Sequence, residues 1–148
     1  MAQAPGLVLP AYFSYYKSPV KMVATDDEGI QAWRLSDETG GWELANDLVR
    51  EILSAVGGEI SHLTVDSFIQ STERDRGRHL RGEGPVFALY ETVEAILDVA
   101  EREKRPLTAT ELALIRGIRL QTYVMFEEEL RHRGDPAADP GLVQQIES

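Results

Sequence analysis

The hydrophobic pattern of this chain changes its period near residue 40, and this change constrains the fold more than any other feature. Before residue 40, short aromatic and β-branched runs alternate with polar residues, which is typical of half-buried strands. From Trp42 onward, apolar residues recur every three or four positions, which is typical of amphipathic helices. Strands followed by helices, without alternation between them, predict an α+β domain with helices packed on a small sheet.

The N-terminal region is predicted to form a three-stranded antiparallel meander. Its β-prone runs cover residues 11–16, 20–25 and 30–35, and the acidic turn Asp26-Asp27-Glu28-Gly29 separates the last two. We expect Gly29 to adopt the positive φ that closes this turn. We also expect one buried face of the sheet, with Val20 and Met22 inside and Lys21 and Arg34 pointing to water.

About four helices are predicted to follow the meander. Their stripes cover residues 42–56, 64–76, 86–104 and 109–132. Thr108 and Glu111 have the spacing of a capping box, and Leu107 and Leu112 have that of a hydrophobic staple. A short connection around Pro106 predicts that the last two helices form a long antiparallel hairpin. We therefore expect one α+β domain over residues 1–134 and a polar tail over 135–148 with a short turn near residues 142–146.

Composition excludes several chemistries. With no cysteine among 148 residues, the chain has no disulfide, no thiolate nucleophile and no cysteine-bound metal. A net charge of −10 opposes binding to nucleic acid and to anionic membranes. Residues 1–6 lack the basic residues of a signal peptide, and no apolar run approaches a membrane span. We expect a cytoplasmic protein, and the excess of 12 Arg over 3 Lys indicates a bacterial genome rich in G and C.

No catalytic or cofactor motif was found, so the sequence predicts no catalytic residues and no cofactor. Two Glu-x-x-His pairs, Glu59 with His62 and Glu129 with His132, have the spacing of metal ligands on one helix face. The first pair follows two glycines in a connection, and the second lies at the end of a helix. We therefore predict no metal site.

The most unusual segment is residues 74–84, which concentrates arginines in an otherwise acidic chain. Three glycines predict a mobile loop here. Guanidinium groups on such a loop suit phosphate or carboxylate groups, so the candidate contacts with an anion or an acidic partner are Arg76, Arg78, His79 and Arg81. On this hypothesis, replacing Arg76 and Arg78 would change stability little. The alternative is that these arginines pair with the chain's own carboxylates.

The helix over residues 109–132 is apolar on more than one face, which favours burial in a homodimer. The leading functional hypothesis is a non-enzymatic binding or regulatory protein of the bacterial cytoplasm that acts through protein–protein contacts. The alternative is a small-molecule-binding or enzymatic domain that holds an anionic ligand at the arginine-rich loop 74–84.

Overall fold

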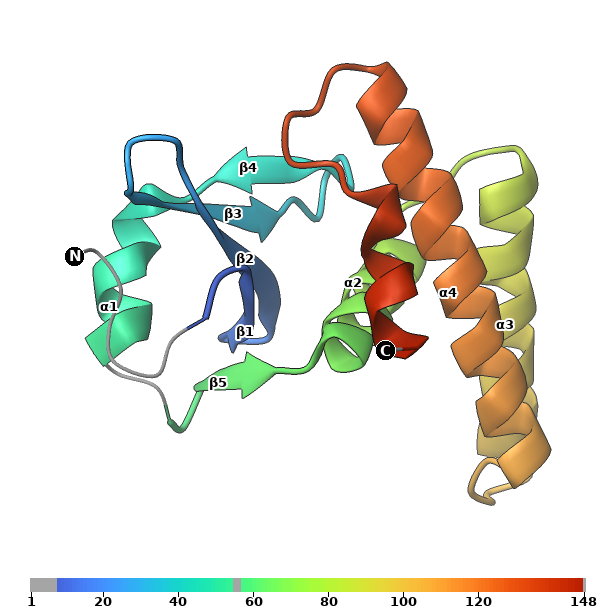
Figure 1. Ribbon diagram of the computed structural model, residues 1–148. Helices are drawn as coiled ribbons and strands as arrows, with labels where there is room; N and C mark the ends of the chain where they lie inside the picture. The colour runs from blue at the N-terminus through green and yellow to red at the C-terminus, as the bar shows by residue number, and fades with distance from the viewer. Residues whose placement is uncertain (1–7, 55–56, 148) are drawn as a thin grey trace.

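Five strands form one antiparallel sheet in the order β4-β3-β2-β1-β5, and helices cover both of its faces (Figure 1). The computed structural model describes residues 8–54 and 57–147. Residues 1–6, considered above for a signal peptide, and Val56, the last residue of the first predicted helix, lie outside the described residues. The strands are β1 (Ala11–Tyr15), β2 (Ser18–Ala24), β3 (Ile30–Leu35), β4 (Trp42–Leu44) and β5 (Ile60–Leu63).

The predicted meander is confirmed as β1, β2 and β3, and the sheet extends beyond it at both edges. Phe13 pairs with Val20, and Met22 pairs with Ala32, in the register of two successive hairpins. β4 adds to the β3 edge, and β5 adds to the β1 edge. The short β5 was not predicted, because its Ile-Ser-His-Leu sequence is too brief to show a period.

Turn chemistry between β2 and β3 differs from the prediction. Glu28, with a φ of 65°, adopts the left-handed conformation expected of Gly29. Gly29 instead makes a close approach, because its N–H donates to Thr25 Oγ1 at 2.9 Å and an added Cβ would lie 3.0 Å from that oxygen. A larger residue here would crowd the Thr25 side chain.

Both faces of the sheet are buried, so the expectation of one solvated face is wrong. On one face, Val20 and Met22 pack under α1 (Val49–Ser54) and the 3₁₀ helix η1 (Asn46–Leu48). On the other, Tyr12 and Leu35 pack against later helices. Lys21, expected in water, is only 4% exposed on this second face.

The helix predicted over residues 42–56 is shorter than expected. Trp42 begins β4, and the α-helical part is limited to Val49–Ser54. The side chain of Asn46 and the N–H of Ala45 both bond to the backbone of Ala32, at 2.8 Å each. These bonds and the burial of the Trp42 ring hold the segment against β3, so tertiary contacts override the helical period.

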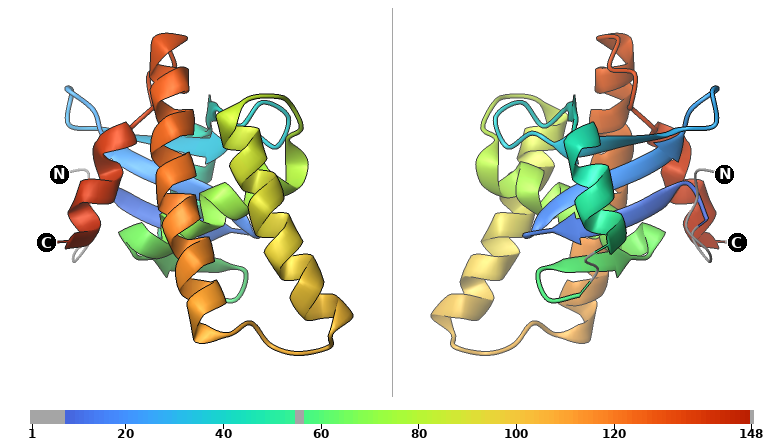
Figure 2. Two further views of the ribbon diagram at one scale, coloured as in Figure 1. Left: turned by 90° about the vertical axis from the view of Figure 1, so that its right-hand side faces the viewer. Right: turned by 90° about the vertical axis from the view of Figure 1, so that its left-hand side faces the viewer.

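The remaining helices are α2 (Val65–His79), α3 (Pro85–Arg102), α4 (Ala109–His132) and the 3₁₀ helix η2 (Pro140–Glu147). The predicted starts are confirmed: Thr64 caps α2, and both bonds of the Thr108–Glu111 capping box are present. α2 and η2 lie against the sheet, α4 packs on them, and α3 packs on α4 (Figures 1 and 2). In Figure 2 the two helices of the predicted hairpin diverge toward their connection, which projects beyond the sheet.

The expected polar tail contributes to the core from residue 137 onward. Leu142 is 1% exposed and lies in the same cluster as Phe68 and Tyr123.

Of the helices in the described ranges, none has the length and apolar character needed to cross a bilayer.

Candidate functional site

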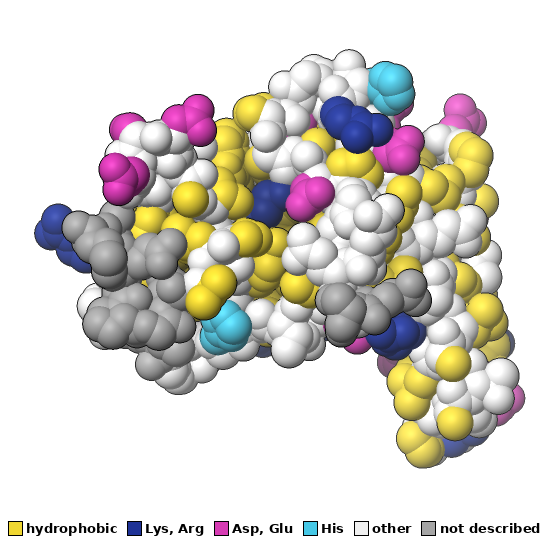
Figure 3. Space-filling model, viewed as in Figure 1, with side chains coloured by type: hydrophobic (Ala, Val, Ile, Leu, Met, Phe, Trp, Pro, Cys, Tyr) yellow, Lys and Arg dark blue, Asp and Glu magenta, His cyan; other side chains and the backbone are white. Residues whose placement is uncertain are grey.

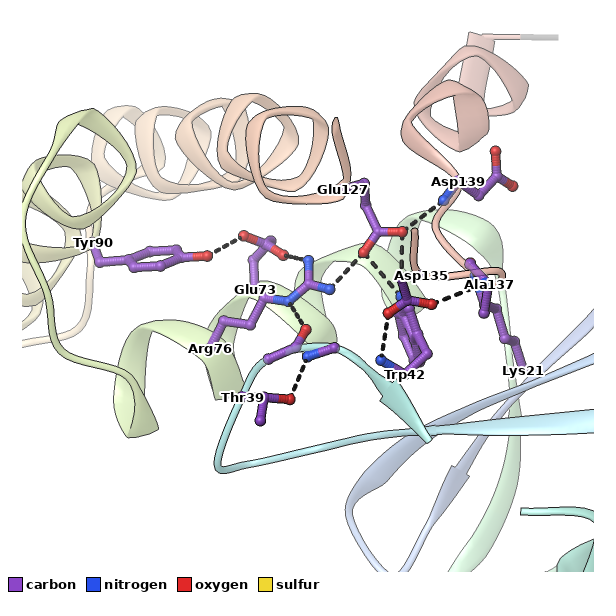
Figure 4. Close-up of polar contacts among 12 residues, drawn as sticks. Lys21, Thr39, Trp42, Glu73, Arg76, Tyr90, Glu127, Asp135, Ala137 and Asp139 are labelled. Carbon is purple, nitrogen blue, oxygen red and sulfur yellow. Dashed lines mark hydrogen bonds and ion pairs between the residues drawn. The ribbon is translucent and has the colours of Figure 1, made fainter. Parts of the chain in front are cut away.

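A buried ion cluster of Glu73, Arg76 and Glu127 lies between the sheet and the helices (Figure 4). All three side chains are 0% exposed. The guanidinium of Arg76 donates Nη1–H to Glu73 Oε2 at 2.8 Å, Nη2–H to Glu127 Oε2, and Nε–H to the Gly40 carbonyl at 2.9 Å. The ring of Phe126 lies 4.2 Å from the same guanidinium.

Further polar groups complete the cluster and join distant segments. Tyr90 of α3 donates its hydroxyl hydrogen to Glu73 Oε1 at 2.8 Å. The Trp42 indole N–H donates to Glu127 Oε2 at 3.0 Å, and the Asp139 N–H donates to Glu127 Oε1 at 2.7 Å. The cluster therefore ties α2, α3, α4, β4 and the segment before η2 to one another.

Charge balance allows this cluster to stay buried. Lys21, over the Trp42 ring at 4.5 Å, donates to the Ala137 carbonyl and brings a second positive charge near Glu127. Burial raises the pKa of Glu73, and Arg76 and Tyr90 oppose that rise. Burial lowers the pKa of Lys21, and Glu127 opposes that fall. Buried charges persist in proteins when they are paired and hydrogen-bonded in this way.

The predicted helix over residues 64–76 is confirmed as α2 and continues to His79, so the loop predicted over residues 74–84 is wrong over residues 74–79. Arg76 faces the interior, and its Nε, Nη1 and Nη2 atoms all donate to internal partners. Arg76 therefore follows the alternative hypothesis, in which the arginines pair with the chain's own carboxylates. One of its partners, Glu127, is brought near only by the tertiary fold. Gly77 lies inside α2, and its missing side chain leaves room for the Tyr90 ring, which lies 3.3 Å from where a Cβ would stand.

The other three predicted anion contacts, Arg78, His79 and Arg81, have different surroundings. Arg81 donates to the carbonyls of Gly77, Arg78 and Leu80 and so caps the end of α2. His79 Nδ1 lies 3.7 Å from Asp37 Oδ1, at the surface. Arg78 is exposed and lines a small cleft described below.

One cleft near the cluster is lined by both apolar and charged side chains. It has a volume of about 430 Å³ and lies between the 38–39 turn, the start of α3 and the C-terminal half of α4. Arg81, Arg133, Glu83 and Glu129 are among its charged lining residues. We call it the Phe87 cleft, and its apolar lining residues are Leu80, Pro85, Val86, Phe87, Met125 and Phe126.

A smaller cleft, of about 40 Å³, lies between α2, α3 and α4. Arg74 and Arg78 of α2 and Arg119 of α4 line it, with Glu73 and Tyr90 of the ion cluster also in its wall. We call it the arginine cleft. Of these three, the sequence places Arg74 and Arg78 in the arginine-rich segment but offers only Arg78 as a candidate contact. Arg119 is missed because only the packing of α4 on α2 brings it to the same place. The one available signal was the i, i+4 spacing of Arg74 and Arg78.

Across residues 8–54 and 57–147, no three His, Asp or Glu side chains form a group that could hold a metal ion. The two Glu-x-x-His pairs considered above lie at separate places, Glu59 and His62 at β5 and Glu129 and His132 at the end of α4.

Comparison of the chain with protein-family models, curated proteins and solved structures found no match.

Proposed function

We propose that this chain is a non-enzymatic binding or regulatory protein of the bacterial cytoplasm that acts through protein–protein contacts, the first of them with a second copy of itself. The observation that carries the proposal is the projecting end of the α3–α4 hairpin. There Leu112 and Leu114 of α4 are 54% and 51% exposed. Figure 3 shows hydrophobic side chains along this projecting end.

The local charge supports contact between two copies at this end. Over residues 101–116 the chain carries three acidic and four basic residues, whereas the whole chain has a net charge of −10. Two acidic molecules therefore repel each other least when these ends meet. Within this end, Arg105 pairs with Glu111 at 2.8 Å, and Arg116 pairs with Asp66 at 3.0 Å, so two of its basic residues are already neutralised.

Twofold pairing is the simplest arrangement for such an end. In a twofold interface the same patch lies on both partners, so each copy covers the exposed leucine on the contacting face of the other, Leu112 or Leu114. This pairing uses the N-terminal end of the helix over residues 109–132, because Ile115 and Ile118 further along already pack against α3. The predicted interface is therefore confined to the projecting end.

Light scattering after size exclusion tests the proposal. We expect the wild type to have twice the mass of one 16.5-kDa chain at micromolar concentration. The double variant L112E/L114E should elute as one chain with an unchanged circular dichroism spectrum. Leu44 on β4 is 56% exposed, so Leu44→Glu is the matched control and should remain paired. A wild-type mass of one chain, or pairing that survives the double variant, would count against the proposal.

A second candidate function is binding of an anionic small molecule with an apolar body in the Phe87 cleft. The volume of about 430 Å³ lies within the range of small-molecule sites, and Arg81 and Arg133 are placed to contact an acidic group. Calorimetric titration with aromatic carboxylates tests it. Phe87→Ala should weaken binding, and equal affinity in wild type and variant would exclude this cleft.

A further inference from the structure

Three arginines converge on the arginine cleft from two helices. Arg74 and Arg78 are one turn apart on α2, and Arg119 comes from α4 across the cleft. Like charges at i, i+4 disfavour each other on an isolated helix, and the third arginine adds to this repulsion. The packing of α4 on α2 holds these charges together although the chain has 25 acidic residues to pair with 15 basic ones.

Two of the three guanidinium groups lack a close carboxylate. Within the described ranges, neither Arg78 nor Arg119 lies within 4 Å of an acidic oxygen, and Arg74 lies 3.7 Å from Asp75 Oδ1. Glu73, in the wall of the cleft, is already bonded to Arg76 and Tyr90. Glu94 of α3 also lines the cleft, without an ion pair to any of the three.

The positive charge of Arg119 is the least favourably placed of the three. Its side chain is half-buried, and burial together with the nearby Arg74 lowers its pKa, with Glu73 and Glu94 opposing the fall. A half-buried cation without a hydrogen-bonding partner is unfavourable until an acceptor reaches it. An anion in the cleft would supply such an acceptor and would relieve the repulsion among all three arginines.

We propose that the arginine cleft is a binding site for a single phosphate group, held by Arg74, Arg78 and Arg119. The planar fork of each guanidinium matches phosphate oxygens, and three forks suit a doubly charged anion better than a carboxylate. A bound water molecule needs roughly 10–15 Å³ of cavity volume. The arginine cleft, of about 40 Å³, therefore has room for a phosphate group but not for a nucleoside. This site is separate from the hairpin end and from the Phe87 cleft.

The test is calorimetric titration of the full chain with inorganic phosphate, against chloride at the same ionic strength. We expect saturable phosphate binding in the wild type. Arg119→Gln and Arg78→Gln should each weaken it about tenfold, which corresponds to about 1.4 kcal/mol. The matched control is Arg131→Gln, which removes one positive charge from an exposed site on α4 outside the cleft and should retain wild-type affinity.

Two results would overturn the proposal: phosphate heats no larger than those of chloride, or equal phosphate affinity in Arg78→Gln and Arg131→Gln. Arg78 is exposed, so its variant is expected to fold and to decide the outcome even where Arg119→Gln is unstable. Phosphate should also raise the melting temperature of the wild type and of Arg131→Gln, and raise that of Arg78→Gln less.

Discussion

At the scale of single residues, Arg76 holds the interior of this molecule together. Its guanidinium joins α2 to α4 through Glu127 and to the 36–41 turn through the Gly40 carbonyl. Local spacing predicts an exposed arginine, because Gly77 and the basic residues around it are typical of a loop. Only the tertiary fold brings Glu127, 51 positions away, to the same place.

Arg76→Ala should therefore destabilise the protein strongly, contrary to the small effect expected from sequence. It leaves two buried carboxylates without their cation, and removing one member of a buried ion pair costs about 3–5 kcal/mol. Urea unfolding measures the free energy. The control Arg131→Ala, at an exposed site, should change it by no more than about 0.5 kcal/mol. Equal stability of the two variants would show that the cluster is not structural.

A side chain at Gly40 should be unfavourable. Its φ is 78°, and an added Cβ would lie 2.6 Å from both Leu80 Cδ1 and Phe126 Cζ. Gly134 has a similar φ of 88° with nothing within 4 Å of the added atom, so it isolates the backbone effect. Gly40→Ala should lower the free energy of unfolding by about 1–3 kcal/mol more than Gly134→Ala does, because of the overpacking alone. Equal losses in both variants would contradict the close packing at Gly40.

At the scale of elements, the sequence predicts features that depend on neighbouring residues and misses features that depend on tertiary contacts. The Thr108–Glu111 capping box was predicted because all of its atoms lie within four residues. The period of residues 42–56 predicted a helix, yet Trp42 is drawn into β4 by its indole bond to Glu127. The candidate site follows the same rule: the sequence offers Arg78, although on a loop and not on α2, and gives no signal for Arg119.

The capping box should make the stability of the protein depend on pH in the acidic range. Hydrogen bonds from Arg105 and from the Thr108 N–H lower the pKa of Glu111 from 4.5 to about 2. A lowered folded-state pKa means that the carboxylate stabilises α4 fully above about pH 4.5 and loses this effect as the pH falls toward 2. Carboxyl NMR should place the Glu111 midpoint near 2. Glu111→Gln should remove part of the pH dependence of stability in this interval, whereas Glu101→Gln, at an exposed site on α3, should not.

η2 should behave as part of the core. Leu142 is 1% exposed among Phe68 and Tyr123, so Leu142→Ala should cost about 2–5 kcal/mol in the free energy of unfolding. Gln144, which is exposed on the same helix, supplies the control Gln144→Ala with a change within about 0.5 kcal/mol. Two unfolding transitions, or no loss in Leu142→Ala, would show that residues 135–148 are a tail independent of the domain.

At the scale of the whole molecule, charge and shape favour one direction of approach. The net charge of −10 is spread over the domain, while the end of the α3–α4 hairpin is nearly neutral and carries exposed leucines. That end projects away from the sheet and from the β2–β3 hairpin (Figure 1). In a twofold pair, the hairpin ends would meet and the β2–β3 hairpins would lie far apart.

The most direct measurement of this arrangement is the spin–spin distance between two labelled copies, which a chain without cysteine allows. A label at Thr110→Cys lies beside Leu112, and a label at Asp27→Cys lies in the distant β2–β3 turn. Pulsed electron resonance should give a short, narrow distance distribution between copies labelled at residue 110 and no defined short distance for residue 27. No dipolar coupling between copies labelled at residue 110, or the shorter distance at residue 27, would contradict self-association through the hairpin end.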